Sequence, residues 1–321
     1  MTLRFLVRRL GQLIPSVVSI VCIGFLLVHL APGDPVVALG GEHGDASYYA
    51  FMRQRFGLDQ PLPTQFVTYA TRVLQGDLGV SYVYGRSVSA VIGERIPATL
   101  LLTGSALLLS VLVAIPMGTL SAAQYRGPAD ILISSSVLAV YSAPLFWIGQ
   151  IALLLFALHL GWLPVQGMTD AGAPPGGLTG AGDVARHLVL PVLVLASHEI
   201  AVLVRITRVG VIEELARDHV RTAQAKGLSQ RRVILRHALP RALYPVIAVV
   251  GARAGGLIAG AVVTEIVFGW PGMGRLLLAS LQARDIPVLL GIFMLVSLAV
   301  VLVNFATDVI YLWRDRRIEL R

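Results

Sequence analysis

Six apolar stretches limit this chain of 321 residues to a helical membrane protein. They cover residues 10–31, 98–125, 131–160, 187–205, 242–265 and 286–307. A helix of about 20 apolar residues crosses ~30 Å of hydrocarbon, so each stretch is long enough or nearly so. The runs are continuous and lack the alternation of barrel strands. We therefore predict an all-α polytopic membrane protein with six transmembrane helices.

Charge supports a membrane topology rather than a nucleic-acid partner. Charged residues make up only 14 % of the chain, against roughly 25 % in a soluble domain. With the N-terminus inside, seventeen lysines and arginines fall on inner segments and eight on outer segments. This is the positive-inside asymmetry. The location of the basic residues therefore indicates that both termini are cytoplasmic, and we do not expect the net charge of +8 to reflect a nucleic-acid partner.

The single cysteine restricts the chemistry. Cys22 lies in the first apolar run, so no disulfide within the chain and no cysteine-based metal site can form. We expect no metal site in this chain. The N-terminal apolar run is too long for a signal-peptide core and lacks a small-residue cleavage site, so we expect it to remain as the first helix.

The basic inner segment 213–240 is predicted to be a helical hairpin. Residues 213–226 include good helix formers, with acidic residues early and a cation late, and Gly227 stands where a glycine ends a helix. Ser229 can cap a second helix that ends near Pro240. The hairpin is too short and too charged to span a membrane.

Two interpretations of this hairpin stay open on its residues alone. It could lie as an amphipathic helix on anionic lipid. It could instead dock into a partner protein, because Thr222, Ala223 and Ala225, with Gly227, give a smooth surface of small residues. Its place between the fourth and fifth helices suits an element that a partner pushes.

The spacing from Ala223 through Gly227 to Leu239-Pro240 resembles the EAA loop of ABC-type permeases. Arg221 and Thr222 stand where that family has Glu and Ala. The resemblance implies that the loop receives the stroke of a separate ATPase. The residues it assigns to this coupling are Arg217, Arg221, Thr222, Ala223, Ala225, Lys226, Gly227, Leu239 and Pro240.

The resemblance extends over nearly the whole chain. It includes Phe56-Gly57-Leu58-Asp59, Gly76-Asp77-Leu78-Gly79, Arg95-Ile96-Pro97-Ala98 and Val267-Phe268-Gly269-Trp270. In this order and spacing the pieces resemble the B-type permease of dipeptide and oligopeptide ABC importers, a family with relatives for nickel and glutathione. The resemblance implies a type I ABC importer permease fold in the bacterial cytoplasmic membrane.

The family resemblance also implies an organisation and a set of partners. We expect residues 1–31 to form the cytoplasmic N-terminus and first helix, 32–97 an extracytoplasmic segment, 98–312 the permease core and 313–321 a basic cytoplasmic tail. A Gly- and Pro-rich outer loop is expected over 161–186. The implied partners are a second permease, one or two ABC ATPase subunits, an extracytoplasmic solute-binding protein and membrane lipid.

No ATP site or catalytic site is predicted. A Walker A loop needs Gly-Lys-Ser/Thr, whereas the only lysine, Lys226, lies between Ala225 and Gly227. His198-Glu199 is followed by Val202 at the fifth position, which excludes a zinc-protease motif. We therefore expect a chain that is not an enzyme and binds no cofactor, with ATP and magnesium used by a partner.

Charges within the apolar stretches are functional hypotheses. Glu199 and Arg253 could serve a proton-coupled secondary transporter, or they could pair between the fourth and fifth helices. In a peptide importer they could also meet the charged peptide termini. The candidate residues of a translocation path are Tyr141, Phe146, Trp147, Glu199, Arg253 and Glu265.

Overall fold

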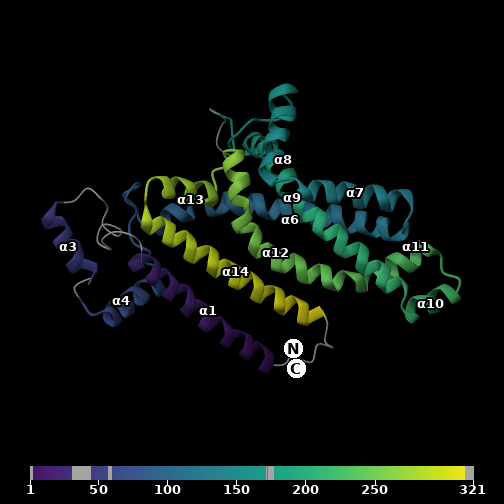
Figure 1. Ribbon diagram of the computed structural model, residues 1–321, viewed down its shortest axis with the longest axis horizontal. Helices are drawn as coiled ribbons and strands as arrows, with labels where there is room; N and C mark the ends of the chain where they lie inside the picture. Colours follow the sequence, from purple (N-terminus) through teal and green to yellow (C-terminus); the bar gives the residue numbers. More distant parts are fainter. Residues whose placement is uncertain (1–2, 31–44, 57–59, 171, 173–176, 315–321) are drawn as a thin grey trace. The chain divides into compact units, whose positions relative to one another are not determined.

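The computed structural model describes residues 3–30, 45–56, 60–170, 172 and 177–314. Within these residues the secondary structure is helical, apart from an isolated bridge between Val80 and Ser87, so the all-α prediction is confirmed. The elements in chain order (Figure 1) are α1 Leu3–Leu30, α3 Ala46–Phe56, α4 Leu62–Leu74, α5 Val88–Gly93, α6 Ile96–Ala123, α7 Pro128–Ser142, α8 Leu145–Ala152, the π-helix η1 Leu153–His159, α9 Gly177–Leu215, α10 Asp218–Ala225, α11 Gln230–Val233, the π-helix η2 Ile234–Ala238, α12 Leu239–Val267, α13 Met273–Gln282 and α14 Ile286–Arg314.

The chain forms two compact units. The first comprises residues 1–99 and 271–302, and the second comprises residues 100–270 and 303–321. Each unit therefore combines segments that are far apart in the sequence.

In the first unit, helix α4 packs against α1. The Phe25 ring meets Phe66 edge-on, with centroids 5.4 Å apart, and lies 5.7 Å from the Tyr69 ring. The His29 Nε2 atom is 3.0 Å from Gln65 Oε1. Burial in this contact raises the pKa of Tyr69 to about 12. Aromatic side chains of α4 thus pack against α1.

A buried carboxylate holds a turn of the same unit. The Ser81 hydroxyl donates to Asp285 Oδ2 at 2.5 Å, and the Val83 amide donates to the same oxygen at 3.3 Å. Asp285 is fully buried just before α14. Burial, together with the charge of Asp285, raises the pKa of the neighbouring Tyr82. The turn after α4 is therefore fixed to the start of the last helix.

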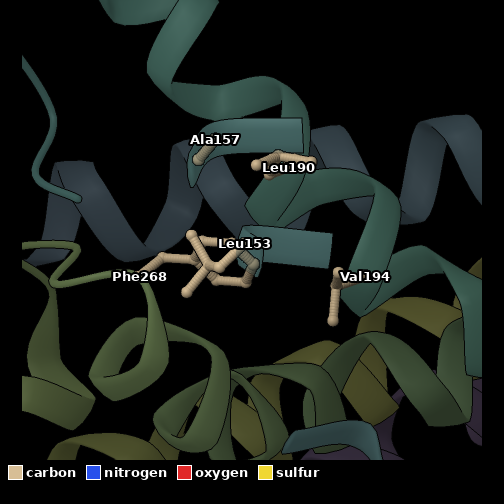
Figure 2. Packing of buried hydrophobic residues seen from close by; sticks show 5 residues of the cluster. All are labelled: Leu153, Ala157, Leu190, Val194 and Phe268. Carbon is tan, nitrogen blue, oxygen red and sulfur yellow. The ribbon is translucent and has the colours of Figure 1, made fainter. Parts of the chain in front are cut away.

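In the second unit, α9 is the central helix, and α7, α8 and α12 pack against it. Five buried side chains from η1, from α9 and from the residue after α12 form one of its apolar clusters: Leu153, Ala157, Leu190, Val194 and Phe268 (Figure 2). The cluster joins segments separated by more than a hundred residues. It therefore specifies how these elements pack in the unit.

The prediction of one continuous helix over 131–160 is wrong. The segment divides into α7 and a second helical part, Leu145–His159, and the two are bent by 100°. Ala143 is extended (φ −84°, ψ 139°), as the residue before a proline prefers, and Pro144 begins the next helix. Proline therefore breaks this run rather than kinking it.

Within the described residues, four helical segments are long and apolar enough to cross a membrane, or five if the bent pair is one span. The four are Val88–Ala123, Thr179–Leu215, Gln230–Gly256 and Ile286–Thr307. Helix α1 adds a shorter apolar part, Gly11–Leu27. Helix α9 begins at Gly177, inside the segment 161–186 that we expected to be a loop.

Close helix contact in the second unit depends on a glycine. A β-carbon placed on Gly118 of α6 would lie 2.7 Å from the Val204 carbonyl oxygen and 2.7 Å from the Thr207 β-carbon, both in α9. A β-carbon on Gly104, in the same helix, would meet nothing within 4 Å. Both glycines lie within α6, but only Gly118 is in close contact with a neighbouring helix.

We expect Gly118→Ala to destabilise the chain by about 1–3 kcal/mol, because the added methyl forces α6 away from α9. Gly104→Ala should be neutral or slightly stabilising, because alanine favours a helix by about 1 kcal/mol over glycine. The measurement is the thermal unfolding midpoint of each purified variant in one detergent. Equal midpoints for the two variants would contradict the assigned contact.

Candidate functional site

The basic hairpin lies between α9 and α12, as predicted, but its helices differ from the expected ones (Figure 1). The helix over 213–226 is interrupted: α9 ends at Leu215, and α10 begins after Arg217, whose backbone is extended (φ −77°, ψ 152°). The second helix does not end near Pro240. It runs from α11 through the π-helix η2 into α12, whose second residue is Pro240.

Gly227 ends α10 as predicted. It has a φ of +78°, in the left-handed region that favours glycine. Its amide donates to the Gln224 carbonyl at 2.9 Å, and the Leu228 amide donates to the Ala223 carbonyl at 3.4 Å. These two bonds form a Schellman motif. Ser229 begins α11, although its hydroxyl makes no capping hydrogen bond.

The two arms of the hairpin share a small apolar core. Val220, Ala223, Val233 and Ala238 are buried together, and Leu228 packs against them. Ala223 is only 5 % exposed, so it does not belong to the exposed surface of small residues that we expected. The glycine turn folds α11 back over α10, and this covers the Ala223 side of α10. The hairpin is therefore an internally packed body rather than a loop.

A histidine connects this body to both neighbouring helices. Arg241, near the start of α12, donates from Nη1 to His219 Nδ1 at 3.0 Å. The other ring nitrogen, Nε2, lies 3.5 Å from Glu214 Oε2 at the end of α9. His219 in α10 is thus in contact with the ends of α9 and α12, which joins the hairpin to these two long helices.

The remaining predicted coupling residues lie mostly on the outside of the hairpin. Leu239 is half-buried at the start of α12. The others are exposed: Arg217, Arg221, Thr222, Ala225, Lys226, Gly227 and Pro240. Arg221 lies 3.5 Å from the exposed Asp218 carboxylate, a contact that contributes little in water. The hairpin therefore presents a cationic surface on a packed core.

The charged pair in the apolar stretches is confirmed as a contact between α9 and α12. Arg253 Nη1 donates to Glu199 Oε1 at 2.9 Å, and Glu199 is only 8 % exposed. The second carboxylate oxygen, Oε2, is buried and has no hydrogen-bond partner among the described residues. Burying a carboxylate with an unpaired oxygen is costly, and the hydrogen bond from Arg253 to the other oxygen offsets part of that cost.

The other candidate path residues are not gathered into one cluster. The Tyr141 ring lies 5.7 Å from the ring of His198, the neighbour of Glu199. Phe146 and Trp147 are more than half exposed in α8, beyond the bend. Glu265 is fully buried near the end of α12. Among these candidates, Arg253 contacts Glu199, and Tyr141 contacts the adjacent residue His198.

One group of side chains has the composition of a metal site. Oxygen and nitrogen atoms of Asp170, Asp183 and His187 lie within 4.8 Å of one another. Their mutual contacts account for this geometry: His187 Nδ1 is 3.0 Å from the Asp183 carbonyl oxygen, and the Asp170 amide donates to Asp183 Oδ2 at 2.8 Å. These bonds hold the residues before α9 against its first turns.

Sequence reasoning missed one polar cluster at the α6–α7 turn. Asp130 accepts two hydrogen bonds from the Arg208 guanidinium and one from Ser121. The only sequence signal is an acidic residue in the first turn of a helix that follows Pro128. Its partner is 78 residues away, and no local pattern identifies it.

Comparison with protein families matches both parts of the chain. Residues 114–320 match the family described as binding-protein-dependent transport system inner membrane component. Residues 2–103 match the model of the N-terminal part of such membrane components. The two matches together cover almost the whole chain.

Curated relatives are similar along their whole length. The dipeptide transport system permease protein DppB of Escherichia coli K12 is 38 % identical over 330 residues, with 96 % of each chain covered. The di/tripeptide transport system permease protein DppB of Pseudomonas aeruginosa is 39 % identical, with 99 % of each chain covered. The glutathione transport system permease protein GsiC of Salmonella paratyphi A is 38 % identical, with 96 % of each chain covered.

A solved structure shares the fold. A chain of the MetNI methionine ABC transporter in inward-facing conformations superposes with a TM-score of 0.55. The match covers 70 % of this chain and 97 % of that one, at 16 % sequence identity. Three observations support the same family: the apolar spans, the hairpin between α9 and α12, and the family matches along the chain. This chain belongs to the family of inner membrane components of binding-protein-dependent transport systems, and is a permease of the ABC importer type.

Proposed function

We propose that this chain is a permease subunit of an ATP-driven peptide importer and couples to separate ATPase subunits through the hairpin 213–240. The observation that carries the proposal is an internally packed cationic hairpin joined to two long helices. Its core is packed, its turn is a Schellman motif, and His219 contacts both α9 and α12. Force applied to its exposed surface would therefore reach α9 and α12 without being absorbed by the loop.

We assign contact with the ATPase to the exposed residues of the hairpin. Arg217, Arg221, Thr222, Ala225 and Lys226 would face the ATPase. Ala223 would act from inside, by holding the two arms together. ATP and magnesium would be bound by the partner, and closure of the ATPases on the hairpin would tilt α9 and α12 and open the path outward.

A peptide substrate is supported by the relatives and by the charged pair. Relatives of this chain are named as dipeptide and di/tripeptide permeases. A short peptide carries an ammonium and a carboxylate, and Glu199 and Arg253 offer one complementary charge to each. The glutathione permease GsiC is about equally similar, so glutathione is the second candidate, and nickel the third from the family resemblance alone.

The proposed complex has a defined topology. We assign six membrane crossings, with α1 as the first and the bent pair Pro128–Ser142 and Leu145–His159 as the third, and we place both termini in the cytoplasm. Residues 1–31, 32–97, 98–312 and 313–321 keep the roles expected above. A second permease would complete the path, and the segment 32–97 would contact the solute-binding protein.

Replacement of Gly227 tests the coupling assignment. A β-carbon there would meet nothing within 4 Å, so any penalty comes from the positive φ and not from lack of space. We expect Gly227→Val to lower peptide uptake by about tenfold or more, because a β-branched residue resists the left-handed region. Gly227→Asn should keep most of the activity, because asparagine tolerates that region.

Uptake of a labelled dipeptide by cells with the complete importer is the measurement, at equal membrane levels of each variant. Normal uptake by Gly227→Val would refute the coupling assignment. Equal loss in Gly227→Val and Gly227→Asn would refute the conformational explanation and indicate that the surface itself tolerates no side chain.

The proton-coupled secondary transporter considered from the sequence is supported only by the buried, unpaired Glu199 Oε2, whereas the family match supports the ATP-driven importer. A purely structural role explains the presence of Glu199 in an apolar stretch equally well, because its hydrogen bond to Arg253 pairs the two charges. The two candidates differ in the energy source that they predict.

We expect uptake in proteoliposomes with the complete importer to require ATP and to be unchanged when a protonophore removes the pH gradient. Glu199→Gln should lower ATP-driven uptake, because it leaves Arg253 without its charge partner. Uptake driven by a pH gradient without ATP, and lost in Glu199→Gln, would establish the secondary transporter instead.

A further inference from the structure

Asp130 is a buried carboxylate of the second unit that accepts several hydrogen bonds. It lies in the first turn of α7 and is 3 % exposed. Its Oδ1 accepts from the Ser121 hydroxyl at 2.5 Å and from Arg208 Nε at 2.6 Å, and the Ser134 hydroxyl is 3.3 Å away. Its Oδ2 accepts from Arg208 Nη2 and from the Arg126 amide, each at 2.8 Å.

These bonds connect three helices. Ser121 belongs to α6, Asp130 to α7 and Arg208 to α9. The guanidinium binds the carboxylate through two parallel hydrogen bonds, a geometry that lysine cannot reproduce. The Tyr125 ring lies 5.4 Å from the Arg208 guanidinium and 5.1 Å from that of Arg126, which adds cation–π contacts on the same side.

The same part of α9 also holds the coupling hairpin. One turn beyond Arg208, Val211 is buried with Ala122 of α6, Ile234 of η2 and Ala242 of α12. A β-carbon on Gly210 would lie 3.1 Å from the Ala242 carbonyl oxygen, so α9 and α12 are in close backbone contact there. Thus Asp130 attaches the α6–α7 turn to α9 directly beside the attachment of the hairpin.

We propose that Asp130 and Arg208 are positioning residues that transmit hairpin displacement to α6 and α7. With the pair intact, the cytoplasmic ends of α6, α7, α9 and α12 move as one body. Without it, α9 and α12 still respond to the ATPase, but α6 and α7 do not follow, so ATP hydrolysis continues without productive opening of the path. This inference rests on the proposed coupling role of the hairpin.

The test compares Asp130→Asn, Arg208→Lys and the double variant with wild type in the complete importer in proteoliposomes. The readout is the number of labelled dipeptides transported per ATP hydrolysed. We expect each single variant to assemble and to hydrolyse ATP within about twofold of wild type, while this ratio falls by about tenfold. The double variant should be no worse than either single variant, because both changes remove one interaction.

Arg205→Lys is the matched control, since Arg205 is an exposed arginine one turn earlier in α9. It should keep the wild-type ratio. An unchanged ratio in Asp130→Asn and Arg208→Lys, or an equal fall in the control, would overturn the proposal.

Loss of assembly in both single variants would also overturn the proposal, because it would assign the pair to folding alone. Failure of the proposed function itself would show separately, in wild type, as uptake that does not depend on ATP.

Discussion

Backbone amides and carbonyls have no water to bond within a membrane, and this constraint shapes the rest of the structure. It explains why the apolar stretches form helices, and the cost of burying a charge without a partner explains two of the polar contacts between those helices. Glu199 pairs with Arg253, and Asp130 binds Arg208 and Ser121. In each case a charge that would be costly alone is placed where a second helix supplies its partner. The charged groups therefore also specify which helices lie together.

The hairpin between α9 and α12 satisfies a different requirement. An element that transmits force must be stiffer than its attachments, and isolated helices of eight residues are marginal in water. Here α10 is stabilised by its packing against α11 and η2, by the Schellman turn at Gly227 and by His219. The exposed arginines and the lysine add little to stability and remain available for a partner. Stability and recognition are thus assigned to opposite sides of the same short helix.

Features that depend on local sequence could be predicted. The apolar runs indicated helices, a glycine after a run of helix formers indicated the end of α10, and two opposite charges in neighbouring apolar stretches indicated the Glu199–Arg253 pair. The matched families confirm the permease resemblance. The coupling role of the hairpin residues stays a proposal.

Features that depend on distant partners could not be predicted. The burial of Ala223 requires α11 to fold over α10, and the Asp130 cluster requires α9 to pass beside the α6–α7 turn. The 100° bend after α7 lies at Pro144, and the proline alone does not determine whether a helix is kinked or broken there. Backbone geometry at Arg217 likewise interrupts a segment that contains many good helix formers.

Site-directed cross-linking tests the central claim most directly, because the chain has one cysteine, Cys22. In a Cys22→Ser background, Lys226→Cys places a thiol on the exposed surface of the hairpin, and Val220→Cys places one in its core. A short thiol-to-amine cross-linker is added to the tagged chain purified with its partners, and mass spectrometry identifies the adducts. We predict an adduct between Lys226→Cys and an ABC ATPase subunit, and no such adduct from Val220→Cys. Co-purification of the ATPase without an adduct at the exposed position would contradict docking at the hairpin.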